Sequence, residues 1–381
     1  MRPFVFCSVL FVLTACASTR EAVTPLCTSH GEDGICRPFR LEVITMDPER
    51  NLQKPLAAFN PSGYVIISGI LVGALDSEWL VGMSMKERAV KWMVRTDPRV
   101  ASPVAAFGSW VVVGLRDGRL LKLEAETGKQ VWESSLARFS DRDFVLSGST
   151  LLVYCANQQI FALDFLTGKT RWVYDVGGTG ELTMRGGASP AVRNQKVYFG
   201  TSAGDLRVLD LESGQLLARI EPGFVESRFH DIVGSLAIEN NRVVLSRSDG
   251  VVTALDMNSN RGTSLWKEEL TSVTTSAFRE GVFFVGCLNG HIYALDSGSG
   301  RRIWELSTGA PVGAIVPGEK AVYVSSPEGR LTVVDPANGA VIWSDDLAGY
   351  VDPRPVVFGD RIYFGTGLRS LYGYQLVGKA I

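Results

Sequence analysis

The chain of 381 residues has little of what catalysis or nucleic-acid binding usually needs. It contains three histidines, His30, His230 and His291, and no two of its six cysteines are adjacent. None of the histidines lies in a nucleophile elbow, a His-Glu-x-x-His helix or a phosphate-binding loop. The formal net charge is -2 and no basic stripe stands out, which argues against nucleic-acid binding. The sequence therefore predicts no catalytic residues, no resident metal and no cofactor.

The apolar run near the N-terminus, residues 3–13, is too short to span a bilayer. It follows a basic start and ends in Leu-Thr-Ala-Cys at residues 13–16, which is typical of a bacterial lipobox. This pattern predicts that residues 1–15 are a signal peptide and that Cys16 carries lipid, with an ordinary secretory signal as the alternative. Ala17 after the cysteine favours the periplasmic face of the outer membrane over retention at the inner membrane.

Residues 16–38 are polar and irregular and predict a lipidated cysteine followed by a flexible tether. Cys27 and Cys36 lie nine positions apart within it. Because the periplasm permits disulfides, we expect a small loop-closing disulfide here, with two separate thiols as the alternative. A metal site with His30 would lack a fourth ligand. Cys155 and Cys287 fall in strands of different repeats and are expected to be buried apolar residues.

A phrase recurs about every forty residues in the rest of the chain: an apolar strand followed by Asp-x-x-x-Gly-x-x-x-Trp. The Asp can bond to the backbone of its turn, the Gly supplies a positive φ, and the Trp offers an apolar plate between neighbouring sheets. Four short strands in about forty residues are typical of a propeller blade. The units end near Trp92, Trp132, Trp172, Ala218, Trp266, Trp304 and Trp343.

An eighth unit begins at Tyr350 but stops before its final strand. The run Phe39–Met46 alternates as a strand should, and pairing it with the last blade would close the ring and remove an exposed edge. The sequence therefore predicts an all-β, eight-bladed propeller over residues 39–381. Seven blades is the alternative, because the first unit, taken from Leu75-Asp76 to Trp92, carries eight extra residues.

Two consecutive units are longer than the others. Trp172 to Ala218 spans 46 residues and Ala218 to Trp266 spans 48, against about forty elsewhere. Added length in consecutive connections predicts two excursions close together on the ring. Loops on a rigid scaffold are where binding residues tend to lie.

The repeat resembles that of the pyrroloquinoline quinone (PQQ) dehydrogenases. Those enzymes are longer and carry an adjacent Cys-Cys pair and calcium carboxylates, whereas this chain lacks the pair and shows no equivalent carboxylate cluster. A small periplasmic PQQ-dependent dehydrogenase and a polysaccharide- or cell-wall-binding propeller lipoprotein are the alternative functions.

Lipobox, tether and eight repeats together resemble the BamB family, the lipoproteins of the outer-membrane β-barrel assembly (BAM) machinery. The more specific match is residues 181–190, where the family carries a Leu-x-Leu-Arg-Gly loop that contacts BamA. The resemblance implies a non-enzymatic scaffold in which Leu182, Met184 and Arg185 bind BamA at its POTRA region. A second contacting stretch has an Asp-x-Asp pattern, of which this chain keeps Asp231 but has Val233 at the second position.

Overall fold

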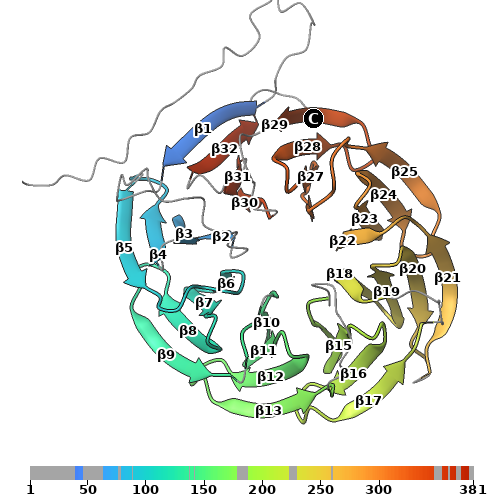
Figure 1. The fold of residues 1–381 in the computed structure, drawn as a ribbon, viewed down its shortest axis with the longest axis horizontal. Helices are drawn as coiled ribbons and strands as arrows, with labels where there is room; N and C mark the ends of the chain where they lie inside the picture. Colours follow the sequence, from blue (N-terminus) through green and yellow to red (C-terminus); the bar gives the residue numbers. More distant parts are fainter. Residues whose placement is uncertain are drawn as a thin grey trace, which may run out of the picture.

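The computed structural model describes residues 39–45, 63–75, 79–87, 89–136, 138–140, 142–177, 188–222, 230–258, 261–346, 354–358, 361–365 and 370–376. Over these ranges the strands form eight four-stranded sheets arranged as a ring (Figure 1). The predicted all-β, eight-bladed propeller is confirmed, and the seven-bladed alternative is wrong. No helix within the described ranges is long and apolar enough to cross a membrane. The predicted signal peptide and tether, with Cys16, Cys27 and Cys36, lie outside the described residues.

Each blade is an antiparallel meander that runs from an inner to an outer strand. Blades 1 to 4 comprise β2 (Tyr64–Ile67), β3 (Ile70–Leu75), β4 (Trp79–Ser84), β5 (Ala89–Arg95); β6 (Ala105–Phe107), β7 (Trp110–Gly114), β8 (Arg119–Glu124), β9 (Gln130–Ser135); β10 (Val145–Ser147), β11 (Thr150–Tyr154), β12 (Gln159–Asp164), β13 (Thr170–Asp175); β14 (Ala191–Arg193), β15 (Lys196–Gly200), β16 (Leu206–Asp210), β17 (Leu216–Ile220). Blades 5 to 7 comprise β18 (Ile232–Glu239), β19 (Arg242–Arg247), β20 (Val251–Asp256), β21 (Thr263–Glu269); β22 (Val273–Arg279), β23 (Val282–Cys287), β24 (His291–Asp296), β25 (Arg302–Ser307); β26 (Ala314–Pro317), β27 (Val322–Ser325), β28 (Arg330–Val334), β29 (Val341–Asp346).

Blade 8 takes its strands from both ends of the described chain. Its order from outside to inside is β1 (Phe39–Thr45), β32 (Ser370–Leu376), β31 (Arg361–Gly365) and β30 (Val356–Phe358). β1 is antiparallel to β32 along its whole length, from Phe39 opposite Leu376 to Thr45 opposite Ser370. The predicted N-terminal strand therefore closes the ring, and Figure 1 shows it as the blue arrow beside the red ones.

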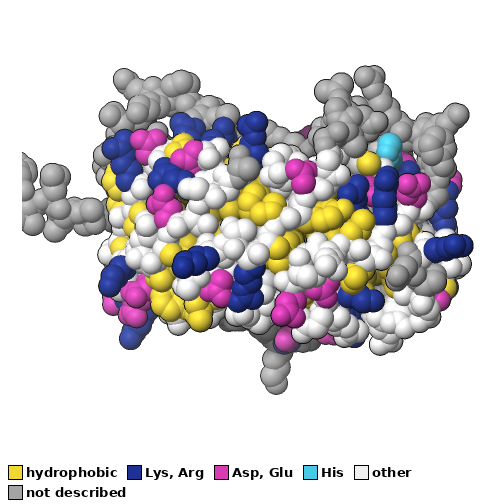
Figure 2. Space-filling model, turned by 90° about the horizontal axis from the view of Figure 1, so that it is seen from below, with side chains coloured by type: hydrophobic (Ala, Val, Ile, Leu, Met, Phe, Trp, Pro, Cys, Tyr) yellow, Lys and Arg dark blue, Asp and Glu magenta, His cyan; other side chains and the backbone are white. Residues whose placement is uncertain are grey.

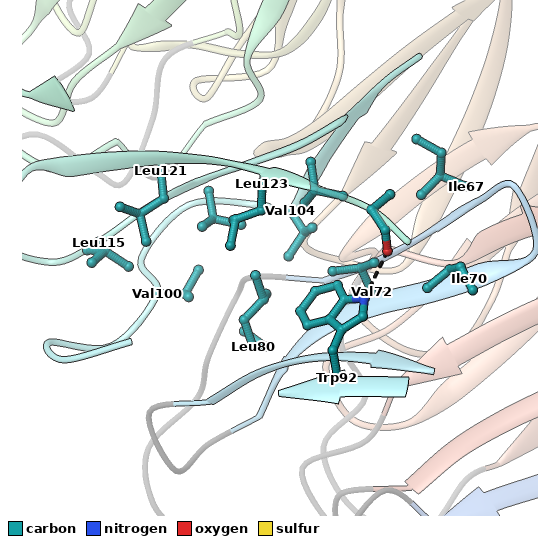
Figure 3. Close-up of a cluster of buried hydrophobic side chains, with 14 residues drawn as sticks. Ile67, Ile70, Val72, Leu80, Trp92, Val100, Val104, Leu115, Leu121 and Leu123 are labelled. Carbon is teal, nitrogen blue, oxygen red and sulfur yellow. Dashed lines mark hydrogen bonds between the residues drawn. The ribbon is translucent and has the colours of Figure 1, made fainter. Parts of the chain in front are cut away.

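Tryptophans of the outer strands fill the seams between blades. The indole of Trp92 in β5 lies against Gly128 of the next blade, where an added Cβ would come within 2.6 Å of the ring. Its Nε1 donates to the carbonyl of Ala125 at 2.9 Å (Figure 3). The same pair of contacts recurs for Trp132 with Gly168 and Phe165 O, Trp172 with Gly214 and Leu211 O, Trp266 with Gly300 and Ser297 O, and Trp304 with Gly339 and Pro336 O. The predicted Trp plate is confirmed, and its hydrogen bond to the neighbouring blade is an addition.

The assignment of the first unit was wrong. Leu75 ends β3, the second strand of blade 1, and therefore does not precede the turn between the third and fourth strands. The turn begins at Ser84, whose Oγ accepts from the backbone N–H of Glu87 at 3.1 Å. Ser84 and Trp92 then have the ordinary spacing of the repeat, without extra residues. Leu75-Asp76, at the end of the second strand, matches by chance the Leu-Asp pair that ends the third strand in other repeats.

Blade 4 closes its seam differently because Ala218 stands at the Trp position. Ile220, two residues further along β17, packs on Gly262 of blade 5 instead, and a Cβ added there would come within 2.7 Å of Ile220 Cγ2. Ile220 is 2% exposed. An aliphatic side chain thus replaces the indole in this seam.

The meander gives the ring two different faces. The hairpin turns between the first and second strands and the Asp-x-x-x-Gly turns between the third and fourth lie at one end of each blade. We call this end the turn face. The turns between the second and third strands, and the connections from one blade to the next, lie at the other end. We call that end the connection face.

Candidate partner-docking face

The two long connections predicted from the sequence both belong to the connection face. The first joins β13 of blade 3 to β14 of blade 4, and the second joins β17 of blade 4 to β18 of blade 5. Residues 178–187, with Leu182, Met184 and Arg185, lie outside the described residues, as do residues 223–229. What the structure does describe is the part of the ring from which both connections start.

Asp231, the other predicted contact residue, directly precedes β18 and is 1% exposed. Its backbone carbonyl accepts from the N–H of Ser248 in the neighbouring hairpin at 2.9 Å. Val233, at the position of the second acid of the family pattern, is 8% exposed and packs in the apolar cluster between blades 5 and 6. The departure from Asp to Val is therefore accommodated by core packing.

A buried carboxylate lies between the starts of the two connections. Asp205 is 1% exposed and directly precedes β16, the third strand of blade 4. It accepts a hydrogen bond from the hydroxyl of Thr201, and one of its oxygens lies 2.9 Å from Nε of both Arg207 and Arg219. Burial by itself would lower the pKa of Arg207, but the hydrogen bond and charge of Asp205 outweigh it and raise that pKa. Arg207 therefore stays charged within the seam.

The cluster reaches the first residues of both connections. Nη1 of Arg207 donates to the carbonyl of Val176 at 3.3 Å and to the hydroxyl of Tyr174 at 2.9 Å, so a blade 4 side chain holds the end of blade 3. Nη2 of Arg219 lies 3.2 Å from Oε1 of Glu221, where the second connection begins. One carboxylate thus links two segments that leave the ring from different blades.

The far ends of the two connections also have contacts with the connection face. Ser189, at the end of the first, donates to Asp143 at 3.3 Å, and Asp143 in turn pairs with Arg354 of blade 8. His230, at the end of the second, packs on Gly204, where an added Cβ would come within 2.6 Å of the imidazole. The described ends of both connections are therefore built into the ring.

Sequence reasoning missed Asp205 and Arg207, although the repeat carries a signal for both. Five positions before the turn acid, blades 2 and 7 have the arginines Arg119 and Arg330, whereas blade 4 has Asp205. Three positions before it, blades 2 and 3 have the buried apolar residues Leu121 and Phe161, whereas blade 4 has Arg207. Only a blade-by-blade alignment within the chain shows this reversal.

The remaining candidates for chemistry have structural surroundings. Cys155 and Cys287 are fully buried in different blades, as predicted, and burial raises the pKa of Cys287 to about 12, so its thiol stays protonated. His291 begins β24 of blade 6, and its Nδ1 lies 2.9 Å from Glu305 Oε1. In the described part of the chain no three His, Cys, Asp or Glu side chains are grouped to hold a metal ion.

The flank of the ring shows a different kind of surface. Figure 2 shows apolar side chains along the middle of the flank and charged ones toward its two rims. Outer strands of successive blades contribute exposed apolar residues, among them Val131, Val173, Leu216 and Leu265. Because they come from separate blades, they form a belt and not a pocket. The connection face, with its built polar cluster, is the stronger candidate site.

Comparison with known proteins agrees with this architecture. A family model described as outer membrane protein assembly factor BamB matches residues 76–306 and 288–378. The protein of that name from Yersinia pestis is 26% identical over 326 residues, which cover 80% of this chain and 79% of that protein. The one from Moranella endobia is 23% identical over 271 residues, which cover 69% of each chain.

Solved structures share the fold. The crystal structure of BamB from Moraxella catarrhalis matches with a TM-score of 0.73 and 21% identity over 83% of this chain and 96% of that chain. Quinohemoprotein alcohol dehydrogenase from Comamonas testosteroni matches with a TM-score of 0.62 and 14% identity over 84% of this chain and 76% of that chain. At these identities the likeness shows the fold alone.

The eight sheets and their tryptophan–glycine seams define a β-propeller of PQQ-like repeats. Because the family model covers most of the ring, the chain belongs to the outer membrane protein assembly factor BamB family. The resemblance seen in the sequence is thereby confirmed.

Proposed function

We propose that this chain is a non-catalytic scaffold of the BAM complex that docks on the POTRA region of BamA and aids folding and insertion of outer-membrane proteins. Residues 178–187 provide the dock, with Leu182 and Met184 as apolar anchors and Arg185 as the charged contact. Asp231, being buried, acts from beneath by fixing the start of β18. Lipid on Cys16 holds the protein at the periplasmic face of the outer membrane.

One observation carries the proposal: two long connections start from adjacent blades over a shared buried carboxylate. Membership of the BamB family supports the same partner. An arginine at the centre of a desolvated interface can cost about 2 kcal/mol or more of binding energy when it is removed.

Co-purification of BamA with the detergent-solubilised lipoprotein tests the dock. We expect Arg185→Glu to lose most of the BamA recovered with wild type, because the substitution reverses the charge of the proposed contact. Arg301→Glu, an exposed residue in an Asp-x-x-x-Gly turn of the opposite face, is the matched control and should change nothing. BamA recovery with Arg185→Glu at the wild-type level would rule out this loop as the dock.

Two further measurements separate this function from the alternatives. Cys16→Ala should release the protein from the membrane fraction without lowering its melting temperature. A mature N-terminus found at another residue would rule out the lipid anchor.

A PQQ-dependent enzyme would instead show saturable thermal stabilisation by PQQ with calcium and dye-linked alcohol oxidation, and we expect neither.

A further inference from the structure

The polar cluster around Asp205 is not explained by packing of the ring. At the place of Arg207, blades 2 and 3 have the buried apolar residues Leu121 and Phe161. Taking a carboxylate and a guanidinium out of water costs about as much as their attraction returns, so apolar residues of similar size are often at least as stable. Stability of the seam alone therefore does not require this charged cluster.

What the cluster adds is a link between two segments that the ring otherwise keeps in separate blades. Through Arg207 it reaches the carbonyl of Val176, two positions before residues 178–187. Through Arg219 it reaches Glu221, two positions before residues 223–229. Asp205 accepts from both arginines, so one carboxylate holds both starts. The link is buried at Asp205 and Arg207, which leaves these two groups few alternative arrangements, whereas Arg219 and Glu221 are 52% and 74% exposed and form its looser end.

We propose that Asp205 is a positioning residue that fixes residues 174–177 and 219–222 relative to each other, so that the ring offers one rigid base to a protein partner that docks where the two long connections start. This inference rests on the proposed function for the identity of that partner, BamA. The anchor itself is a property of the free protein and can be measured without the partner.

Three variants of the full chain, compared by amide hydrogen exchange, test the anchor. Arg207→Leu should speed exchange at residues 174–177 alone, and Arg219→Gln at residues 219–222 alone. Asp205→Asn should speed exchange at both segments, each by about fivefold or more, since couplings between sites typically lie in the range of 5- to 150-fold. The control is Arg330→Gln in blade 7, which breaks contacts to Asp346 of 2.8 and 2.9 Å at the same repeat position and should leave both segments unchanged.

BamA binding is measured on the same proteins. Asp205→Asn should weaken it by about fivefold or more, whereas Arg330→Gln should not. If Asp205→Asn lowers the melting temperature, Asp205→Arg combined with Arg207→Leu replaces it. This pair repeats the Arg119 and Leu121 pattern of blade 2 and should keep the ring folded while losing BamA affinity to a similar extent.

The outcomes separate the two proposals. If Asp205→Asn leaves exchange at 174–177 and 219–222 as in wild type, or speeds it equally over all blades, the anchor is wrong. If the wild-type protein does not bind BamA but the segment-specific exchange pattern is found, the anchor stands and the proposed partner fails. If exchange changes as expected and BamA binding does not, the anchor exists but does not serve the dock.

Discussion

The seam between blades 3 and 4 is built in two ways, one at each face. At the turn face, the indole of Trp172 lies on Gly214 and donates to Leu211 O at 3.0 Å, as in the other Trp seams. At the connection face, Asp205 binds Arg207 and Arg219, and Arg207 stands at the position where blades 2 and 3 have buried apolar residues. The first arrangement repeats around the ring and serves the fold. The second occurs where two long connections start, and this difference locates the candidate function.

A buried charge alone does not mark a functional site, and Lys122 shows why. It is 1% exposed, donates to the carbonyl of Phe165 at 2.8 Å, and has its Nζ 3.7 Å from the centre of the Phe165 ring. Burial lowers the pKa of Lys122. Its contacts remain within the seam between blades 2 and 3, whereas those of Asp205 reach both long connections. The reach of a cluster, and not its polarity, distinguishes the two.

The comparison of the two faces assumes that β1 closes the ring and that the long connections do not. Removing β1 tests this assumption and should have the largest effect. Deleting residues 39–45 leaves the edge of β32 unpaired and abolishes the backbone bonds along seven residues. At about 1 kcal/mol for each net hydrogen bond, we expect a loss on the order of 5 kcal/mol, or aggregation through the open edge. Thermal unfolding should show a clear drop, while deletion of residues 17–38 should change it little. Equal melting of the two truncations would mean that β1 does not close the ring.

A single turn-face substitution should give the next largest effect. Trp304→Ala removes an indole that is 7% exposed and packed on Gly339, and should cost about 3–5 kcal/mol in the free energy of unfolding. Trp304→Phe keeps an apolar ring but loses the 2.8 Å bond to Pro336 O, and should cost about 1 kcal/mol from that bond. Denaturant titration gives both values. The distinction between faces fails if Trp304→Ala weakens BamA binding of the folded protein as much as Asp205→Asn does.

The smallest expected effect is a pH-dependent contribution of Asp164, in a turn of the turn face, to the stability of the fold. Hydrogen bonds from Arg171 and then Thr167 lower the pKa of Asp164 from 3.8 to about 2. Because the folded pKa is depressed, the ionised Asp164 stabilises the fold fully above its ordinary pKa, and this contribution is lost as the pH falls toward about 2. Wild type should melt slightly above Asp164→Asn at pH 7, and the gap should close near pH 2. A gap of the same size at both pH values would contradict the assignment.

The architecture was predictable because most repeats carry the same phrase, so that an error in one unit does not change the number of blades or the fold. The misassigned Leu75 illustrates the limit: a local pattern cannot show which of two consecutive strands precedes the turn. Asp205 could not be found from the residues that recur in every blade, because it stands at a position where this blade differs from the others. The burial of Asp231 was also beyond the sequence, since it depends on Ser248 from another hairpin.

The pairing of β1 with β32 has a consequence for the time course of folding. In a chain that emerges from its N-terminus, β1 arrives before any blade and must wait for its partner until the last one has appeared. Closure therefore needs an encounter between segments from opposite ends of the described chain, and such distant contacts are slow to form. A circular permutant that begins at residue 354 and links residue 376 to residue 39 would turn β32 and β1 into neighbours in sequence. We expect it to refold faster than the natural chain in a stopped-flow experiment. Its slowest distant contact should then be the one between blades 7 and 8.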